Sequence, residues 1–111
     1  MTEKKIENDI KKYLKTIKGL FFWKEHGGMY GTSGIPDLIV CYKGVFIALE
    51  VKSEKGKLTP LQKATLEKIK KSGGYAAVVR SVYNTMKCID EIDKTLYREI
   101  KGEVKWHTEI I

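Results

Sequence analysis

Apolar and polar residues follow one another along the chain with periods that predict seven secondary-structure elements. Spacings of three and four residues mark one face of a helix, whereas short, almost wholly apolar runs are typical of buried strands. In chain order the pattern gives a helix, three strands, a helix, a strand and a helix, at residues 3–18, 20–23, 37–42, 45–52, 59–72, 75–82 and 84–100. A hairpin followed by a crossover helix and a further strand predicts an α/β fold, with a mixed sheet flanked by helices in the order α-β-β-β-α-β-α.

The second and third strands are joined by Lys43-Gly44, which fits the centre of a two-residue hairpin turn. Pairing outward from this turn places Asp37 directly opposite Glu50. Because side chains alternate along a strand, Lys52 shares the face of Glu50. Like charges that face each other across a sheet oppose folding. Two acids and a base at the end of an apolar hairpin therefore indicate a divalent cation.

The cluster has the chemistry of a Mg²⁺ or Mn²⁺ site. Asp37 and Glu50 offer carboxylate oxygens, and the Val51 carbonyl could supply a third oxygen, the ligand type that these hard cations prefer. Such a cation would bind a phosphate and lower the pKa of a bound water. Lys52 could orient that water or stabilise charge in the transition state. Each residue alone has an ordinary surface or turn explanation, but the three on one face favour a metal site.

Further polar residues lie near this cluster in the predicted fold. Thr59 and Gln62 open the second helix with the spacing of a capping box. The glycine-rich segment 25–35 contains neither GxxxxGK[ST] nor GxGxxG, the signatures of nucleotide phosphate sites. Ser33 in this segment and Arg80 in the fourth strand could contact a phosphate backbone, or could be ordinary polar surface residues.

Composition and charge narrow the class of partner. The 111-residue chain has 21 Lys and Arg against 14 Asp and Glu, a net charge of +7, which favours nucleic acid over other partners. Its length suits one domain. No apolar run approaches the roughly 18 residues of a membrane span, and the charged start lacks a secretory signal, so we expect a cytoplasmic protein. Cys41 and Cys88 lack disulfide or zinc spacing and should be free thiols.

Two groups of apolar residues carry further expectations about packing. The aromatic run at residues 21–23 is expected in the core rather than as a platform for bases. The tail, residues 101–111, exposes Trp106 and two isoleucines beyond the last helix. We expect this tail to form an edge strand or a contact between two subunits.

Gly34-Ile35-Pro36-Asp37, followed across the hairpin by Glu50-Val51-Lys52, resembles the PD-(D/E)xK phosphodiesterase superfamily. Together with the helix start at 58–62 and the strand end at 78–80, residues 3–90 are similar to a stand-alone VRR-NUC domain, the virus-type replication-repair nuclease. The resemblance implies a restriction-endonuclease-like fold for residues 1–100 as a single nuclease domain.

The same resemblance implies roles for four residues. Asp37 and Glu50 would be the metal ligands, and Lys52 the catalytic base or the residue that orients the water. Gln62 matches a glutamine of the family motif, so a catalytic role and a capping role both stay open.

The family also places a glutamate of the first helix near the metal. Glu3 lies near the middle of the apolar stripe of residues 3–18 and Glu7 toward its edge, so Glu3 is the better candidate ligand. An acid in the first turn is also favoured by the helix dipole alone.

These observations predict a Mg²⁺- or Mn²⁺-dependent DNA endonuclease. The chain carries no helix-turn-helix or zinc finger, so selectivity would rest on DNA shape and charge. Stand-alone family members resemble Holliday-junction-resolving enzymes, and a homodimer with two sites fits paired cuts across a junction. The alternatives are a flap or single-strand nuclease of the same fold, or a basic DNA-binding subunit whose nuclease site is idle. The family implies DNA repair in a bacterial or phage-infected host cytoplasm.

Overall fold

The computed structural model describes residues 1–26 and 34–106 of the chain. Its elements are α1 (Glu3–Lys15), β1 (Leu20–Lys24), β2 (Leu38–Tyr42), β3 (Val45–Val51), α2 (Pro60–Lys71), β4 (Tyr75–Val79) and α3 (Val82–Ile100). The predicted order of elements is confirmed, and the observed ends lie within a few residues of the predicted ones. The fourth strand ends before Arg80, which therefore lies after the strand and not within it.

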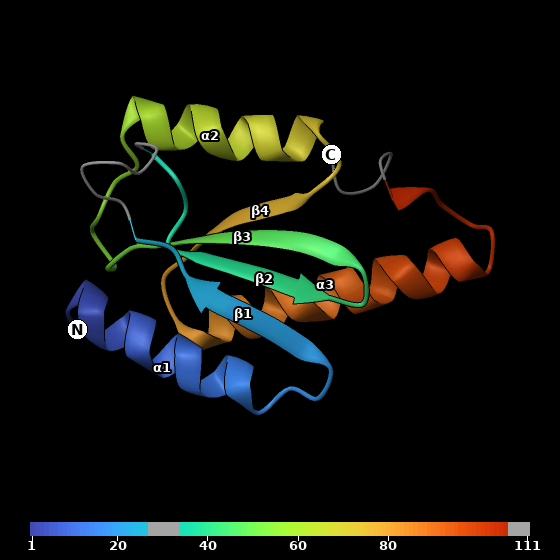
Figure 1. The fold of residues 1–111 in the computed structure, drawn as a ribbon, viewed down its shortest axis with the longest axis horizontal. Helices are drawn as coiled ribbons and strands as arrows, with labels where there is room; N and C mark the ends of the chain where they lie inside the picture. Colours follow the sequence, from blue (N-terminus) through green and yellow to red (C-terminus); the bar gives the residue numbers. More distant parts are fainter. Residues whose placement is uncertain (27–33, 107–111) are drawn as a thin grey trace.

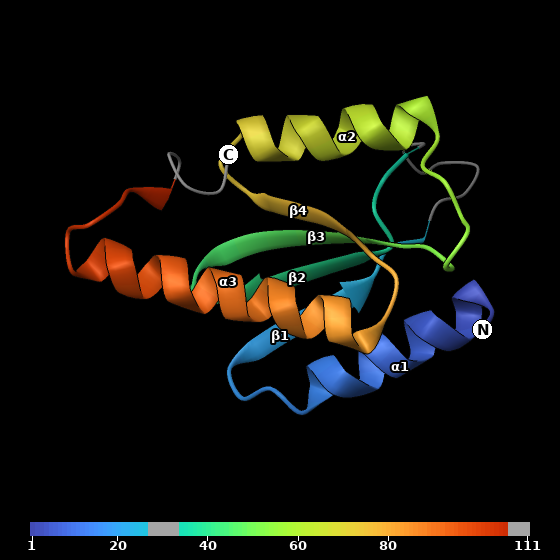
Figure 2. The ribbon, with the colours of Figure 1, turned by 180° about the vertical axis from the view of Figure 1, so that it is seen from behind.

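Within the described residues, four strands form one mixed sheet in the order β1-β2-β3-β4. The pairs β1/β2 and β2/β3 are antiparallel, and β3/β4 is parallel because α2 carries the chain back across the sheet. Helices α1 and α3 lie on one face of the sheet and α2 on the other (Figures 1 and 2). The predicted α/β architecture is confirmed. No helix of this part of the chain combines the length and hydropathy of a bilayer crossing.

The β2–β3 hairpin has the predicted register. Leu38 pairs with Leu49 at its open end, so the next step outward sets Asp37 beside Glu50. The turn residues Lys43 and Gly44 both have positive φ, 52° and 79°. A tight hairpin turn of this kind requires such angles because its twist must match that of the strands.

The sheet separates a large core from a smaller one. Side chains of α1 and α3 pack on one face against β2 and β3, and the fully buried members include Ile10, Leu14, Leu38, Val40, Ile47, Leu49, Val51 and Ile92. The smaller core under α2 contains Ile39, Ala48, Leu66 and Ala76. Since side chains alternate along β3, Phe46 and Glu50 share the α2 face with Ala48, and Val51 lies on the other face.

The aromatic run of β1 lies only partly in the core. Phe22 packs against the large core, but Phe21 is 66% exposed and Trp23 42% exposed. Helix α2 runs along β4, which is the edge strand opposite to β1 (Figure 1). It therefore does not cover these two rings. The prediction that all three aromatics are core residues is therefore wrong for Phe21 and Trp23.

The described part of the tail packs back on the domain. Trp106 is 9% exposed and belongs to the large core, and its indole Nε1 donates to the Gly73 carbonyl at 2.8 Å. Its backbone N–H donates to Glu99 Oε2 at 2.6 Å. Residues 101–106 contain no strand. The prediction that Trp106 is exposed is therefore wrong, because the indole packs in the core. Residues 107–111 lie outside the described residues, so an edge strand or a subunit contact formed by the tail stays a prediction.

Both cysteines are free thiols, as predicted. Cys41 is exposed on β2, and Cys88 is half-buried on α3.

Replacing Trp106 with alanine should lower the free energy of unfolding by about 3–5 kcal/mol, because a large core side chain and a buried hydrogen bond are lost. Trp106→Phe keeps most of the packing and should cost about 1–2 kcal/mol. Urea unfolding measures both, with Ile100→Ala at an 84% exposed position as the control. A loss below about 1 kcal/mol in Trp106→Ala would show that the tail does not pack on the core.

Candidate active site

Asp37, Glu50 and Lys52 meet at one end of the sheet, where β2 begins and β3 ends. Glu50 lies within β3, and Lys52 follows it on the same side of the strand. The Lys52 Nζ lies 3.7 Å from Glu50 Oε2, and the two side chains are 12% and 3% exposed. The juxtaposition expected from the hairpin is thus present, and the catalytic and ligand roles of these residues stay predictions.

Asp37 is held by donors on both carboxylate oxygens. Its Oδ2 accepts from the backbone N–H of Val51 at 2.8 Å, and its Oδ1 accepts from Lys24 Nζ at 3.1 Å. The bond to Val51 ties the start of β2 to the end of β3, so the carboxylate has a fixed orientation. It also brings the Val51 peptide next to Asp37, and the role of the Val51 carbonyl as a metal ligand stays a prediction.

Glu50 is a buried acid that faces another acid. Burial, followed by the negative charge of Asp37, raises the pKa of Glu50 to about 8, against the partial opposition of Lys52. The ionised form of Glu50 is therefore costly in the protein without a cation. Its Oε2 accepts from Gln62 Nε2 at 3.2 Å, which fixes the side chain in the position that faces Asp37.

Gln62 is both a capping residue and a neighbour of the acids. Its Oε1 accepts from the Thr59 backbone N–H at 2.9 Å, and its own N–H donates to Thr59 Oγ1 at 3.1 Å. The predicted capping box is confirmed. Because the cap occupies Oε1, the amide group is turned so that Nε2 reaches Glu50. The two roles left open by the sequence are compatible, and direct participation of Gln62 in catalysis stays a prediction.

Glu7, not Glu3, is the acid of α1 that the structure connects to Asp37. Glu7 is 6% exposed and accepts from Lys24 Nζ at 2.7 Å. Glu3 is exposed in the first turn of α1, about one turn before Ile6, the first buried residue of this helix. Its negative charge nevertheless contributes to the raised pKa of Glu50. Glu3 is thus exposed but close enough for its charge to act on Glu50, and its role as a metal ligand stays a prediction.

Lys24 is the site residue that the sequence reasoning missed. Its ammonium lies between Glu7 and Asp37, within 3.1 Å of both. Burial lowers the pKa of Lys24, but the hydrogen bonds and charges of the two acids outweigh it and leave this pKa raised. Glu7 is held ionised in turn, because Lys24 and Lys11 outweigh the effect of burial and lower its pKa. The sequence did contain one sign of this role, because Lys24 is a charged residue at the end of an otherwise apolar strand. That this strand pairs with β2 is known from the structure.

Arg80 has a structural function in this structure. Its Nη1 donates to the carbonyls of Ser53, Glu54 and Gly56 at 2.6, 3.3 and 2.7 Å. Since β4 runs parallel to β3, the residue after β4 lies beside the connection that follows β3. Arg80 thereby holds the loop next to Lys52, and its contact with phosphate stays a prediction. Ser33 lies outside the described residues.

The donor set suits a hard divalent cation. In residues 1–26 and 34–106, no group of three or more His, Cys, Asp and Glu side chains is placed to hold a metal. The carboxylate of Asp37 is close enough to Glu50 for its charge to raise the pKa of Glu50. Mg²⁺ is commonly bound by one or two carboxylates and keeps several waters, so this pair fits its requirements.

The stability of the metal-free protein should fall as the pH rises from about 5 to 8, in part through Glu50. Its pKa is about 8 in the folded protein and 4.5 in the reference state. Over this range the folded state keeps a proton that the unfolded state has lost, so the free energy of unfolding decreases with pH. Glu50→Gln removes this titration and should flatten the slope. Urea unfolding in EDTA measures how the free energy of unfolding changes with pH, and Glu67→Gln, at an exposed position of α2, is the control. An equal pH dependence in wild type and Glu50→Gln would refute the raised pKa.

Comparison with known proteins identifies the family of the chain. The family model of the VRR-NUC domain matches residues 3–83. A solved structure titled "VRR_NUC domain" is 30% identical, with a TM-score of 0.67 over 81% of this chain and 97% of that chain. Another, titled "VRR_NUC domain protein", is 22% identical and shares the fold, with a TM-score of 0.66 over 81% of this chain and 86% of that chain. No match was found among curated proteins. The chain belongs to the VRR-NUC domain family, a nuclease module of the PD-(D/E)xK type.

Proposed function

We propose that the protein is a Mg²⁺- or Mn²⁺-dependent endodeoxyribonuclease that hydrolyses phosphodiester bonds in branched DNA. The observation that carries this proposal is the Glu50 carboxylate, 3% exposed, with Lys52 Nζ 3.7 Å away and Asp37 raising its pKa. Two acids that face each other oppose folding, and strongly shifted pKa values gather at functional sites. Membership of a nuclease family supports the same chemistry.

Each residue of the cluster has a distinct task in this reaction. Asp37 and Glu50 would hold the cation, and the Val51 N–H and Gln62 Nε2 keep the two carboxylates in place. A bound Mg²⁺ or Mn²⁺ supplies a water of lowered pKa and neutralises charge on the phosphate. Lys52 lies beside Glu50, where its ammonium would orient the attacking water or stabilise charge that develops on the phosphate.

The proposal extends to two copies that act together on a Holliday junction. The chain has +7 net charge, and its sequence shows no helix-turn-helix or zinc-finger motif, so DNA shape and backbone charge would select the substrate. A two-fold homodimer presents two identical sites, as paired cuts across a junction require. Because Trp106 is buried in the core of its own chain, the contact between two copies would be formed by other residues.

A flap or single-strand nuclease is the second candidate. The exposed rings of Phe21 and Trp23 favour it, because aromatic side chains on a basic protein stack on unpaired bases. An idle DNA-binding subunit is a weaker alternative, since Asp37, Glu50 and Lys52 are all present and lie together at one end of the sheet.

Cleavage assays on a labelled four-way junction, a 5′ flap, a single strand and a plain duplex test the proposal. We expect cuts with Mg²⁺ or Mn²⁺, none with EDTA, and a loss of at least about 100-fold in rate with Lys52→Ala. Lys63→Ala removes the same charge from an exposed position of α2 and is the matched control. Paired cuts on the junction support the resolving homodimer, and a preference for the flap supports the second candidate. Binding to all four substrates without cleavage under any metal would identify an idle subunit.

Lys24→Met should tighten binding of Mn²⁺ in the absence of DNA by about tenfold. Lys24 Nζ donates to Asp37 Oδ1 at 3.1 Å, so its positive charge opposes a cation on the same carboxylate. Isothermal titration calorimetry measures the affinity, with Lys11→Met as a comparison because Lys11 contacts Glu7 instead. If Lys24→Met weakens the binding as Asp37→Ala should, Lys24 positions Asp37 for the metal rather than competing with it.

A further inference from the structure

An apolar surface lies open on the α2 face of the sheet, over β1 and β2. Helix α2 follows β4 and packs on Ile39 of β2, but it leaves β1 and the exposed Cys41 of β2 uncovered (Figure 1). Phe21 is opposite Cys41, which is opposite Phe46 on β3. Phe21 is 66% exposed and Phe46 48% exposed, and Cys41 is exposed as well. The row is continuous with Trp23, whose ring centroid lies 5.9 Å from that of Phe21. Phe21, Trp23, Cys41 and Phe46 are called the aromatic face below.

The aromatic face lies on the same side of the sheet as the two carboxylates. Trp23 pairs with Ile39, and Asp37 is two residues from Ile39 along the chain, so Trp23 and Asp37 are diagonal neighbours, about 7–8 Å apart. Phe46 and Glu50 share this side of β3 because they are four residues apart. A DNA strand with its phosphate at Asp37 and Glu50 would therefore have its next nucleotides over the aromatic face.

The ring of Trp23 is held in a defined position. Its Nε1 donates to Glu25 Oε1 at 3.0 Å, and Phe21 lies beside it. A groove between the sheet and α2 continues this surface, and its lining includes Pro36, Ile39 and Lys68. Flat, fixed and exposed rings beside a positively charged groove are the arrangement on which unpaired bases stack in proteins that bind single strands.

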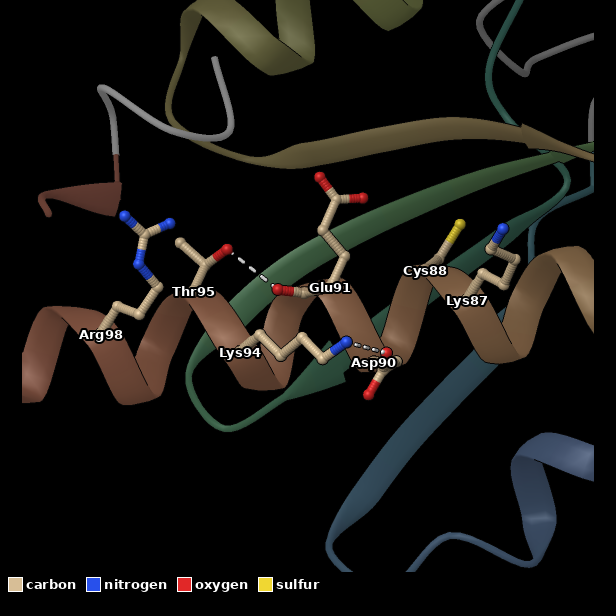
Figure 3. A pocket seen from close by; sticks show the side chains of 7 residues that line it. All are labelled: Lys87, Cys88, Asp90, Glu91, Lys94, Thr95 and Arg98. Carbon is tan, nitrogen blue, oxygen red and sulfur yellow. Dashed lines mark hydrogen bonds and ion pairs between the residues drawn. The ribbon is translucent and has the colours of Figure 1, made fainter.

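Charge favours a nucleic acid over a second copy of the chain as the occupant of this surface. Helix α2, which borders the groove, carries Lys63, Lys68, Lys70 and Lys71 against one acid, Glu67. Two copies that met through this face would bring two basic helices and two charges of +7 together, whereas a polyanion would be attracted. A groove along α3 differs, because acids and bases alternate there and Lys94 Nζ pairs with Asp90 at 3.0 Å (Figure 3).

We propose that the aromatic face binds unpaired bases of the DNA substrate beside the phosphate that is cut. The position of the cut in this inference rests on the proposed function. The binding of bases rests only on the exposure and mutual contact of Phe21 and Trp23. It narrows the substrate class to DNA with single-stranded or unstacked bases next to the cleavage site, as at a branch point or the base of a flap.

Binding of the full chain to fluorescein-labelled oligo-dT and to a duplex of equal length, in EDTA, tests the proposal. Trp23→Ala should weaken oligo-dT binding about 5- to 100-fold, with duplex affinity within about twofold of wild type. Trp23→Phe keeps a ring and should restore most of the affinity. Tyr83→Ala removes a 65% exposed ring from α3 and should change neither affinity. The salt dependence of binding should be unchanged in Trp23→Ala and shallower in Lys68→Ala, because only the lysine releases a counterion.

Three results would overturn the proposal. The first is an equal loss of affinity for oligo-dT and for duplex in Trp23→Ala, and the second is that Trp23→Phe does not restore the affinity for oligo-dT. The third is that the wild-type protein sediments as a dimer and Trp23→Ala as a monomer, which would identify a second copy of the chain as the occupant of the aromatic face. Circular dichroism and urea unfolding of each variant establish that it is folded; where Trp23→Ala does not fold, Phe21→Ala replaces it. Binding in EDTA requires no catalysis, so failure to cleave DNA with any metal would remove the nuclease function and leave this test intact.

Discussion

The register of the β2–β3 hairpin is the constraint on which the rest of the site depends. The tight turn at Lys43-Gly44 sets Leu38 opposite Leu49, and the same register sets Asp37 beside Glu50. A slip by one residue would turn every side chain of one strand to the other face. In a slip of β3, for example, Leu49 and Val51 would lie on the α2 face and Glu50 would enter the large core. The packing of Leu38, Leu49 and Val51 therefore holds the carboxylates in place.

Two neighbouring carboxylates need hydrogen-bond donors or positive charges to offset their repulsion, and Asp37 has more of these close by than Glu50. Asp37 receives a backbone N–H and the ammonium of Lys24. Glu50 receives an amide from Gln62 and a more distant ammonium from Lys52, and its pKa is raised to about 8. Ionisation of Glu50 is therefore opposed in the protein without a cation, as is common for an acid at a functional site. An added cation would stabilise both in the ionised form.

The parts of the site that lie close in sequence were predictable. The hairpin pairing and the capping box of Gln62 depend on a turn dipeptide and on residues three apart, so both follow from local rules. Lys24 was not identified, and Glu3 was preferred to Glu7, because the connection of Glu7 and Lys24 to Asp37 depends on how α1 and β1 pack beside β2. An amphipathic pattern shows which face of α1 is apolar, but not how far along the helix the partner strand extends.

The exposure of Phe21 and Trp23 and the burial of Trp106 were missed for a related reason. An apolar residue in a strand is expected in a core only if some element covers its face, and the sequence does not say that α2 stops short of β1. Trp106 lies beyond the last helix, yet the Gly73 carbonyl offers its indole a hydrogen bond at 2.8 Å. Both outcomes depend on the areas that the helices cover, which are properties of tertiary packing.

The central claim is that Asp37 and Glu50 form one cation site in which Glu50 must lose a proton. Calorimetric titration of the protein with Mn²⁺ at pH 7, in two buffers of different ionisation enthalpy, tests it most directly. Since the pKa of Glu50 is about 8, we expect one ion to bind per chain with release of close to one proton. Binding without proton release, or no binding, would contradict this account of the site.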